Sequence, residues 1–104
     1  MDFKEYQELA KRTAAHHEQA LTNYGLGVAG EAGEVVEIIK KYAFHGHDLD
    51  KDALTKELGD ILWYVSQIAE WANIELEDVA EMNIQKLKKR YPHGFSQERS
   101  KLSI

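Results

Sequence analysis

The chain has 104 residues, of which 43% are hydrophobic and 30% are charged, with a single proline, so we expect one compact domain spanning residues 1–104 rather than a disordered chain. Its net charge of −5 argues against duplex nucleic acid or an anionic membrane surface as the main partner. It has no cysteine, which excludes disulfides, thiolate zinc sites and cysteine nucleophiles.

Two amphipathic helices are predicted in the first half of the chain. Apolar residues recur at helical spacing over residues 3–21, and Asp2 followed by Glu5 has the form of a capping box at the start of this helix. The glycine-containing segment 23–27 is predicted to lead into a second helix over residues 28–44.

Two further helices are predicted in the second half. Asp50 is suited to cap a helix whose apolar stripe covers residues 54–72, with Asn73 available as its C-terminal stop. The fourth helix covers residues 76–90, and Pro92 prevents it from continuing. No alternating strand pattern competes, so we expect an all-α fold, most simply a four-helix bundle, in which some helices could also pair with another subunit.

An acidic pattern occurs twice, once in each of the two central helices. A shift of 26 residues aligns Glu31 with Glu57 and Glu34 with Asp60, each within a Glu-x-Gly-acid pattern followed by two apolar residues. On a helical wheel the four acids lie on the same side of their apolar stripes, so two antiparallel helices would bring them together. Either pair alone is more simply read as a solvated surface, and the repeat favours a site.

Four carboxylates brought together would repel one another unless a cation neutralises them. Oxygen ligands favour Mg²⁺, or Mn²⁺, and Mg²⁺ commonly also binds phosphate oxygens of a substrate. A di-iron site is improbable because no histidine follows a glutamate by three positions. The glycines beside the acids are expected to allow close backbone approach between the helices: Gly30, Gly33 and Gly59.

The fourth helix carries groups that complement phosphate. Asn83, Lys86 and Arg90 fall on one ridge of this helix, where an amide and two cations could grip phosphate oxygens. Basic residues in a last helical turn are also expected from the helix dipole alone, and both readings stay open.

Together these motifs resemble those of the MazG-like, all-α nucleotide pyrophosphohydrolases. The matching patterns are Glu31-x-x-Glu34, Glu57-Leu-Gly-Asp60 and Asn83-x-x-Lys86-x-x-x-Arg90-Tyr-Pro92. The resemblance implies that the four acids hold Mg²⁺, that Asn83, Lys86 and Arg90 contact phosphate, and that the protein is a homodimer or homotetramer. It also implies cleavage of a nucleoside triphosphate between the α and β phosphates. Many members begin the first motif with two adjacent glutamates, whereas here Gly30 precedes Glu31.

The expected reaction is in-line attack on the α-phosphorus by a water that a carboxylate orients or the metal activates, with Glu34 as the water-orienting acid. Candidates for contact with the base are His16, His17, Trp63, Tyr64 and Trp71. Such an enzyme would serve to clean the nucleotide pool. Two alternatives remain, a phosphoribosyl-ATP pyrophosphohydrolase and a non-enzymatic helical dimerisation module. With no apolar signal or membrane segment, we expect a cytoplasmic protein.

Overall fold

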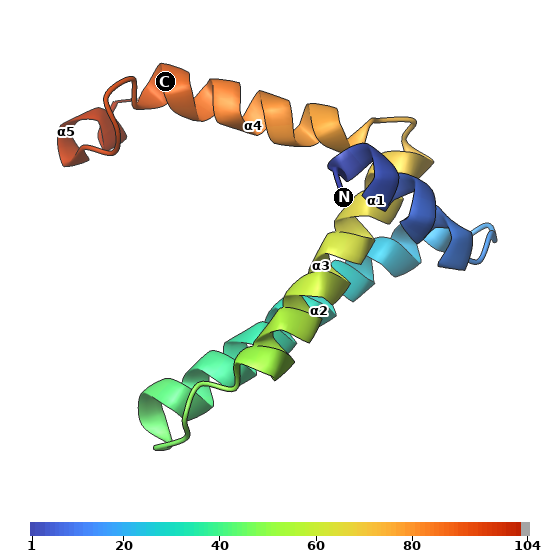
Figure 1. Cartoon of the computed structure of the whole chain (residues 1–104), viewed down its shortest axis with the longest axis horizontal. Helices are drawn as coiled ribbons and strands as arrows, with labels where there is room; N and C mark the ends of the chain where they lie inside the picture. Colours follow the sequence, from blue (N-terminus) through green and yellow to red (C-terminus); the bar gives the residue numbers. More distant parts are fainter. Residues whose placement is uncertain (103–104) are drawn as a thin grey trace.

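The computed structural model describes residues 1–102 and consists of helices joined by short loops (Figure 1). The elements are α1 (Phe3–Ala10), the 3₁₀ turn η1 (Lys11–Thr13), α2 (Ala20–Phe44), α3 (Lys51–Trp71), α4 (Leu76–Arg90) and α5 (Gln97–Ser100). The described residues contain no β-strand, which confirms the all-α class.

The first helix is much shorter than expected. α1 ends at Ala10, and after η1 the chain is irregular up to Gln19, so the prediction of one helix over residues 3–21 is wrong. The Thr13 hydroxyl donates to the Ala10 carbonyl (2.9 Å) and accepts a hydrogen bond from the Trp63 indole N–H (2.9 Å). Thr13 thereby occupies a carbonyl that a continuing helix would use, and α3 holds Thr13 in that position.

The second helix begins earlier than expected, at Ala20, and residues 23–27 are helical rather than a lead-in. A glycine inside a helix costs up to about 1 kcal/mol relative to alanine. Two contacts with α3 offset this cost. The Tyr24 ring is 5% exposed and meets Trp63 edge-on (centroids 5.9 Å apart), and Gly27 packs directly against the Tyr64 ring. Tertiary packing therefore overrides the local preference of the glycines.

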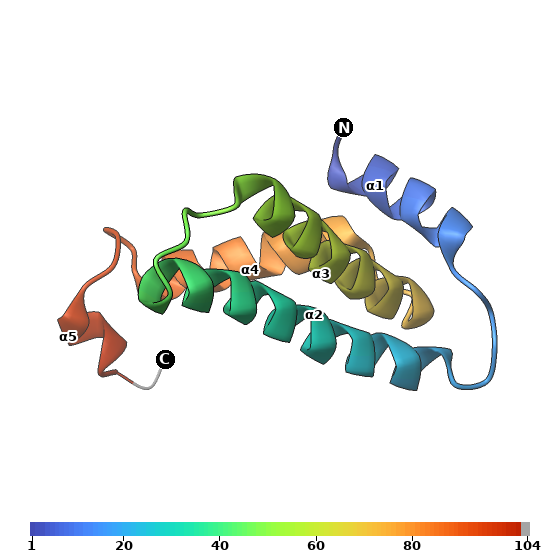
Figure 2. The same ribbon diagram turned by 90° about the horizontal axis from the view of Figure 1, so that it is seen from below.

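Helices α2 and α3 run antiparallel and side by side (Figures 1 and 2), as the acidic repeat predicts. The predicted caps are also confirmed. The Asp50 carboxylate accepts a hydrogen bond from the Ala53 N–H (3.0 Å) at the start of α3, and the Asp2 carboxylate accepts one from the Glu5 N–H (2.8 Å) at the start of α1. Asn73 stops α3 in the left-handed conformation, with φ of 58°.

A buried glutamine joins α1 to the loop between α3 and α4. Gln7 is 5% exposed, and its amide N–H₂ donates to the Ile74 carbonyl (2.9 Å) and to the Glu70 carboxylate (3.1 Å). Its amide oxygen accepts a hydrogen bond from the Leu76 N–H (2.7 Å), one of the donors that a helix start leaves without a partner. The short α1 is therefore fixed across the end of the α2–α3 pair.

Helix α4 leads away from the α2–α3 pair after leaving the end of α3 (Figure 1). Leu76 at its start is buried, at 3% exposed, but apolar residues further along α4 are open to solvent, including Met82 at 74% exposed and Ile84 at 46%. The Arg99 side chain of α5 donates to the carbonyls of Arg90 (2.8 Å) and Lys89 (3.1 Å), which closes the end of α4. Beyond its first turn, the apolar stripe of α4 is thus left open by the other helices of residues 1–102.

Candidate functional site

Three carboxylates converge between α2 and α3. Glu31 comes from the middle of α2, and Glu57 and Asp60 come from adjacent turns of α3. One carboxylate oxygen from each residue lies within 4.8 Å of the others. Glu31 and Glu57 are half-buried, whereas Asp60 is exposed. The antiparallel pair therefore brings together three of the four acids that the repeat singles out.

The charges of this cluster perturb Glu31. Its pKa is raised from 4.5 to about 7, first because its proton can be shared in a hydrogen bond with the Glu57 carboxyl. Desolvation and the negative charges of Glu57, Asp60 and Glu34 raise the pKa of Glu31 further. One Glu31 oxygen, Oε2, is buried and has no hydrogen-bond partner among residues 1–102. A buried acceptor without a partner is costly, so a positively charged or donating group that binds this oxygen would stabilise the site.

This donor set fits a hard divalent cation. All three groups are carboxylates, the ligands that Mg²⁺ and Mn²⁺ prefer, and no thiolate is available because the chain has no cysteine. A cation would neutralise the repulsion that raises the pKa of Glu31 and would satisfy its buried oxygen. Glu31, Glu57 and Asp60 thus form a candidate metal site.

The spacing of the two helices is set by Gly27, one turn before Glu31. A Cβ at this position would overlap the Tyr64 ring, whereas a Cβ at Gly30, Gly33 or Gly59 would meet nothing within 4 Å among the described residues. The expectation that those three glycines allow the close approach is therefore wrong. Their spacing from the acids resembles a packing motif, but the space beside each of these glycines is open in the described chain.

Nothing in the sequence indicates that Tyr6 lies near the acid cluster. Burial raises the pKa of the Tyr6 phenol, and the negative charge of Asp60 raises it further, so α1 brings this hydroxyl near the acid cluster. In the sequence Tyr6 is only one member of the apolar stripe of a helix. No local signal distinguishes it, because its position depends on how α1 crosses α3.

The remaining predicted site residues lie outside the convergent group. Glu34 is exposed one turn further along α2, although its charge still contributes to the raised pKa of Glu31. Asn83, Lys86 and Arg90 lie on α4, which diverges from the acid-bearing helices (Figure 1). One chain alone does not bring these three residues to the carboxylates.

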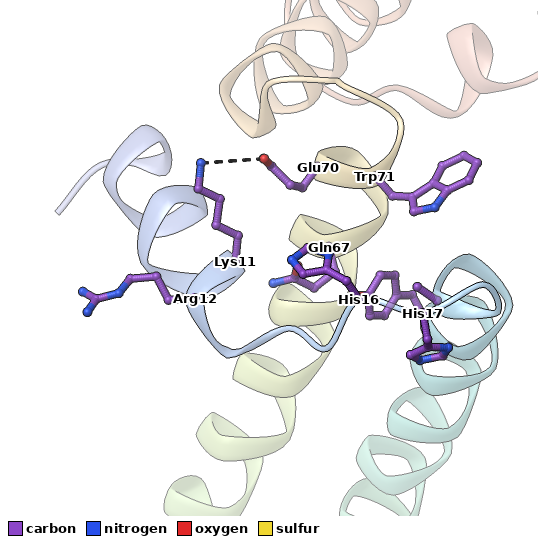
Figure 3. A pocket seen from close by; sticks show the side chains of 9 residues that line it. Lys11, Arg12, His16, His17, Gln67, Glu70 and Trp71 are labelled. Carbon is purple, nitrogen blue, oxygen red and sulfur yellow. Dashed lines mark ion pairs between the residues drawn. The ribbon is translucent and has the colours of Figure 1, made fainter.

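A separate pocket of about 580 Å³ lies where α2 begins and α3 ends (Figure 3). It is bounded by residues 11–24 and by the last two turns of α3, and none of the three acids lines it. The five candidate base contacts lie in two places. His16, His17 and Trp71 line the pocket, whereas Trp63 and Tyr64 pack edge-on against each other with ring centroids 5.1 Å apart.

Among residues 1–102, no helix combines the length and the apolar character that crossing a membrane requires.

Comparison with known proteins agrees with the acidic repeat. Residues 19–95 match the family model of the MazG nucleotide pyrophosphohydrolase domain. The chain is also similar to the Gene 37 protein of Mycobacterium phage L5, with 34% identity over 83 residues that cover 76% of this chain and 73% of the phage protein. No solved structure gives a significant match. The matched region contains α2, α3 and α4 with all three convergent acids, and the chain belongs to the MazG nucleotide pyrophosphohydrolase family.

Proposed function

We propose that this protein hydrolyses nucleoside triphosphates between the α and β phosphates and releases a nucleoside monophosphate and pyrophosphate. The observation that carries the proposal is the convergence of Glu31, Glu57 and Asp60, with a buried Glu31 oxygen that lacks a partner. The proposed cofactor is Mg²⁺, with Mn²⁺ as a substitute, and Glu34 is proposed as the fourth ligand. Such an enzyme would act on the cytoplasmic nucleotide pool.

The chain's own residues have distinct proposed roles. Bound Mg²⁺ would neutralise phosphate charge and stabilise the charge that develops on the phosphoryl group. Glu34 is exposed at the edge of the cluster, where its carboxylate can accept a hydrogen bond from a water and orient it toward the α-phosphorus. The Glu31 carboxyl holds a proton up to about pH 7, and this proton competes with a cation for the same carboxylate.

A single chain is less compact than a monomer of this size is expected to be. The radius of gyration is 16.8 Å, against about 13 Å expected for a compact chain of this length. The accessible surface is 8221 Å², against about 5,900 Å² for a compact monomer of this mass. Exposed apolar residues occur on the second half of α2 and along α4, among them Val36 at 61% and Met82 at 74%. We therefore propose a homodimer or homotetramer.

The same association would explain the position of the phosphate-binding candidates. Asn83, Lys86 and Arg90 lie on the diverging α4 and cannot serve the acids of their own chain in this arrangement. We propose that they contact phosphate where α4 meets a second copy. Light scattering should give the mass of two or four chains, and Met82→Lys should shift the protein toward monomer and reduce hydrolysis. A fully active monomer would contradict this part.

Product analysis tests the activity. Purified protein with Mg²⁺ and a panel of deoxynucleoside triphosphates should yield monophosphate and pyrophosphate, and a chelator should abolish the reaction. Glu57→Gln and Asp60→Asn should reduce hydrolysis by orders of magnitude. Asp52→Asn, an exposed acid in the first turn of α3, is the matched control and should keep full activity. Release of orthophosphate alone, or full activity of both cluster variants, would refute the proposal.

A further inference from the structure

The pocket between the start of α2 and the end of α3 contains a buried amide nitrogen that donates no hydrogen bond to residues 1–102. Gln67 on α3 is 2% exposed, yet its amide nitrogen has no hydrogen-bond partner in the part of the chain that the structure describes. The residue lines a pocket of about 580 Å³, a size typical of small-molecule sites. A buried N–H₂ group that donates to nothing costs free energy, unless a ligand that enters the pocket supplies the acceptor.

The walls of the pocket suit a flat, neutral ring. Trp71 stands at the rim, 59% exposed, and Tyr24 forms part of the wall, with its ring held edge-on by Trp63. Aromatic side chains in these positions offer stacking faces to a planar ligand. The His17 Nδ1 accepts a hydrogen bond from the Gln19 N–H (3.2 Å), which leaves Nε2 as the nitrogen available to donate.

The cations of the pocket do not favour a phosphate at its centre. The Lys11 ammonium is paired with the carboxylates of Glu8 (3.1 Å) and Glu70 (3.8 Å), and Glu70 itself lines the pocket. The Arg12 side chain points away from Gln67 and Trp71 (Figure 3). Besides His17 Nε2, the pocket therefore offers a ligand the Gln67 amide nitrogen, which is neutral and almost fully buried.

The pocket and the acid cluster share one face of the helix pair. On α3, Gln67 lies two turns beyond Asp60, and on α2, Tyr24 lies two turns before Glu31, so both steps are roughly 11 Å along the helix axis. Seven residues return a helix almost to the same face. This separation is about the reach of a nucleotide from its phosphates to its base.

We propose that this pocket holds the nucleobase of the triphosphate whose phosphates meet the acid cluster, with the Gln67 amide nitrogen donating to a ring nitrogen or carbonyl oxygen of the base and Trp71 stacking on it. The assignment rests on the proposed function. It makes Gln67 a specificity-determining residue. A ligand that lacks a base would leave this amide buried and without a partner, which is a strong basis for rejection.

Binding of nucleoside monophosphates tests the pocket without hydrolysis. The full-length protein is titrated with each of the four deoxynucleoside monophosphates in the presence of a chelator, and binding is followed by calorimetry and by quenching of tryptophan fluorescence. At least one monophosphate should bind and quench Trp71. Gln67→Met keeps the length of the side chain and removes the donor, so it should weaken that binding by about tenfold. Gln85→Met, at an exposed glutamine of α4, should change nothing.

The outcomes separate this proposal from the proposed function. If Gln67→Met binds as tightly as the wild type and keeps its ratio of kcat/KM values among the triphosphates, the pocket assignment is overturned while the hydrolase assignment stands. Equal binding of ribose 5-phosphate would overturn the pocket assignment too, because it would show an anion site. Base-selective binding without hydrolysis supports the pocket and refutes the activity. If Gln67→Met does not fold, Trp71→Ala at the exposed rim replaces it and should weaken binding in the same way.

Discussion

Replacing Gly27 by alanine tests how the helix pair sets the acid site. The new Cβ would overlap the Tyr64 ring, which is itself packed edge-on against Trp63 (centroids 5.1 Å apart) and has little freedom to move. Overpacking of this kind costs about 1–3 kcal/mol. A glycine-to-alanine change inside a helix otherwise gains up to about 1 kcal/mol. Gly25→Ala in the same helix is the matched control, since its Cβ would meet nothing within 4 Å.

The helix-propensity gain is common to both variants, so their difference isolates the overlap with Tyr64. We expect Gly27→Ala to be less stable than Gly25→Ala by about 1–3 kcal/mol. At roughly 4–8 °C per kcal/mol, thermal melts at equal protein concentration should separate the two by about 4 °C or more. Because Glu31 lies one turn from Gly27, the increase in Tm on adding Mg²⁺ should also shrink in Gly27→Ala alone.

A double-mutant cycle shows whether the ring is the cause. In a Tyr64→Ala background the space beside Gly27 is open, so the penalty of Gly27→Ala should largely disappear. Equal stability of the Gly25→Ala and Gly27→Ala proteins would refute the close approach of α2 to α3. A penalty that persists without Tyr64 would assign the cost to another contact.

Three further predictions concern the proton on Glu31, the buried hydrogen bonds of Gln7 and the exposed hydrogen bond between Trp63 and Thr13. The pKa of the Glu31 carboxyl is 4.5 when unperturbed and about 7 in the folded protein. Between these two pH values the metal-free folded state binds a proton that the unfolded state has lost. The free energy of unfolding therefore falls as the pH rises through this window. The Tm increase caused by Mg²⁺ should therefore be larger at about pH 8 than at about pH 6, and Glu31→Gln should remove this difference; equal increases in the wild type would contradict the assignment. Gln7→Leu leaves the Leu76 N–H and the Ile74 carbonyl without hydrogen-bond partners. It should lower the free energy of unfolding, measured by urea denaturation, by about 2–4 kcal/mol. The control Gln97→Leu should leave this free energy unchanged. Trp63→Phe removes the donor to Thr13 and should cost about 1 kcal/mol. Thr13→Val should cost less in the Trp63→Phe background than in the wild type, because only the bond from Thr13 to the Ala10 carbonyl is then left to lose.

Much of the local structure follows from short-range patterns. The caps at Asp2 and Asp50, the stop at Asn73 and the fourth helix over residues 76–90 are all observed, because capping and helical periodicity involve neighbours only a few positions apart. The acidic repeat likewise identified three acids that the structure brings together. The repeat places these acids on the same side of their apolar stripes, and the register of the two helices decides which of them meet.

The errors share one cause, which is packing between elements distant in sequence. Residues 14–19 have enough helical character to look continuous with α1, but Thr13 is engaged by Trp63, fifty residues later. The glycines at 25 and 27 look like a break, yet Tyr24 and Gly27 pack against α3 strongly enough to keep the helix intact.

The sequence by itself determined that the chain is helical, where its acids repeat and which cation chemistry those acids suit, since these properties reside in residue type and in periodicity along one helix. Only the tertiary structure decided that Gly27 rather than Gly30 or Gly33 permits the close approach, that Tyr6 lies near Asp60, and that the Gln67 amide is buried without a partner. Each of these depends on the distance and rotation between two helices. That geometry is fixed by the shapes of side chains in contact, which a pattern within one helix does not contain.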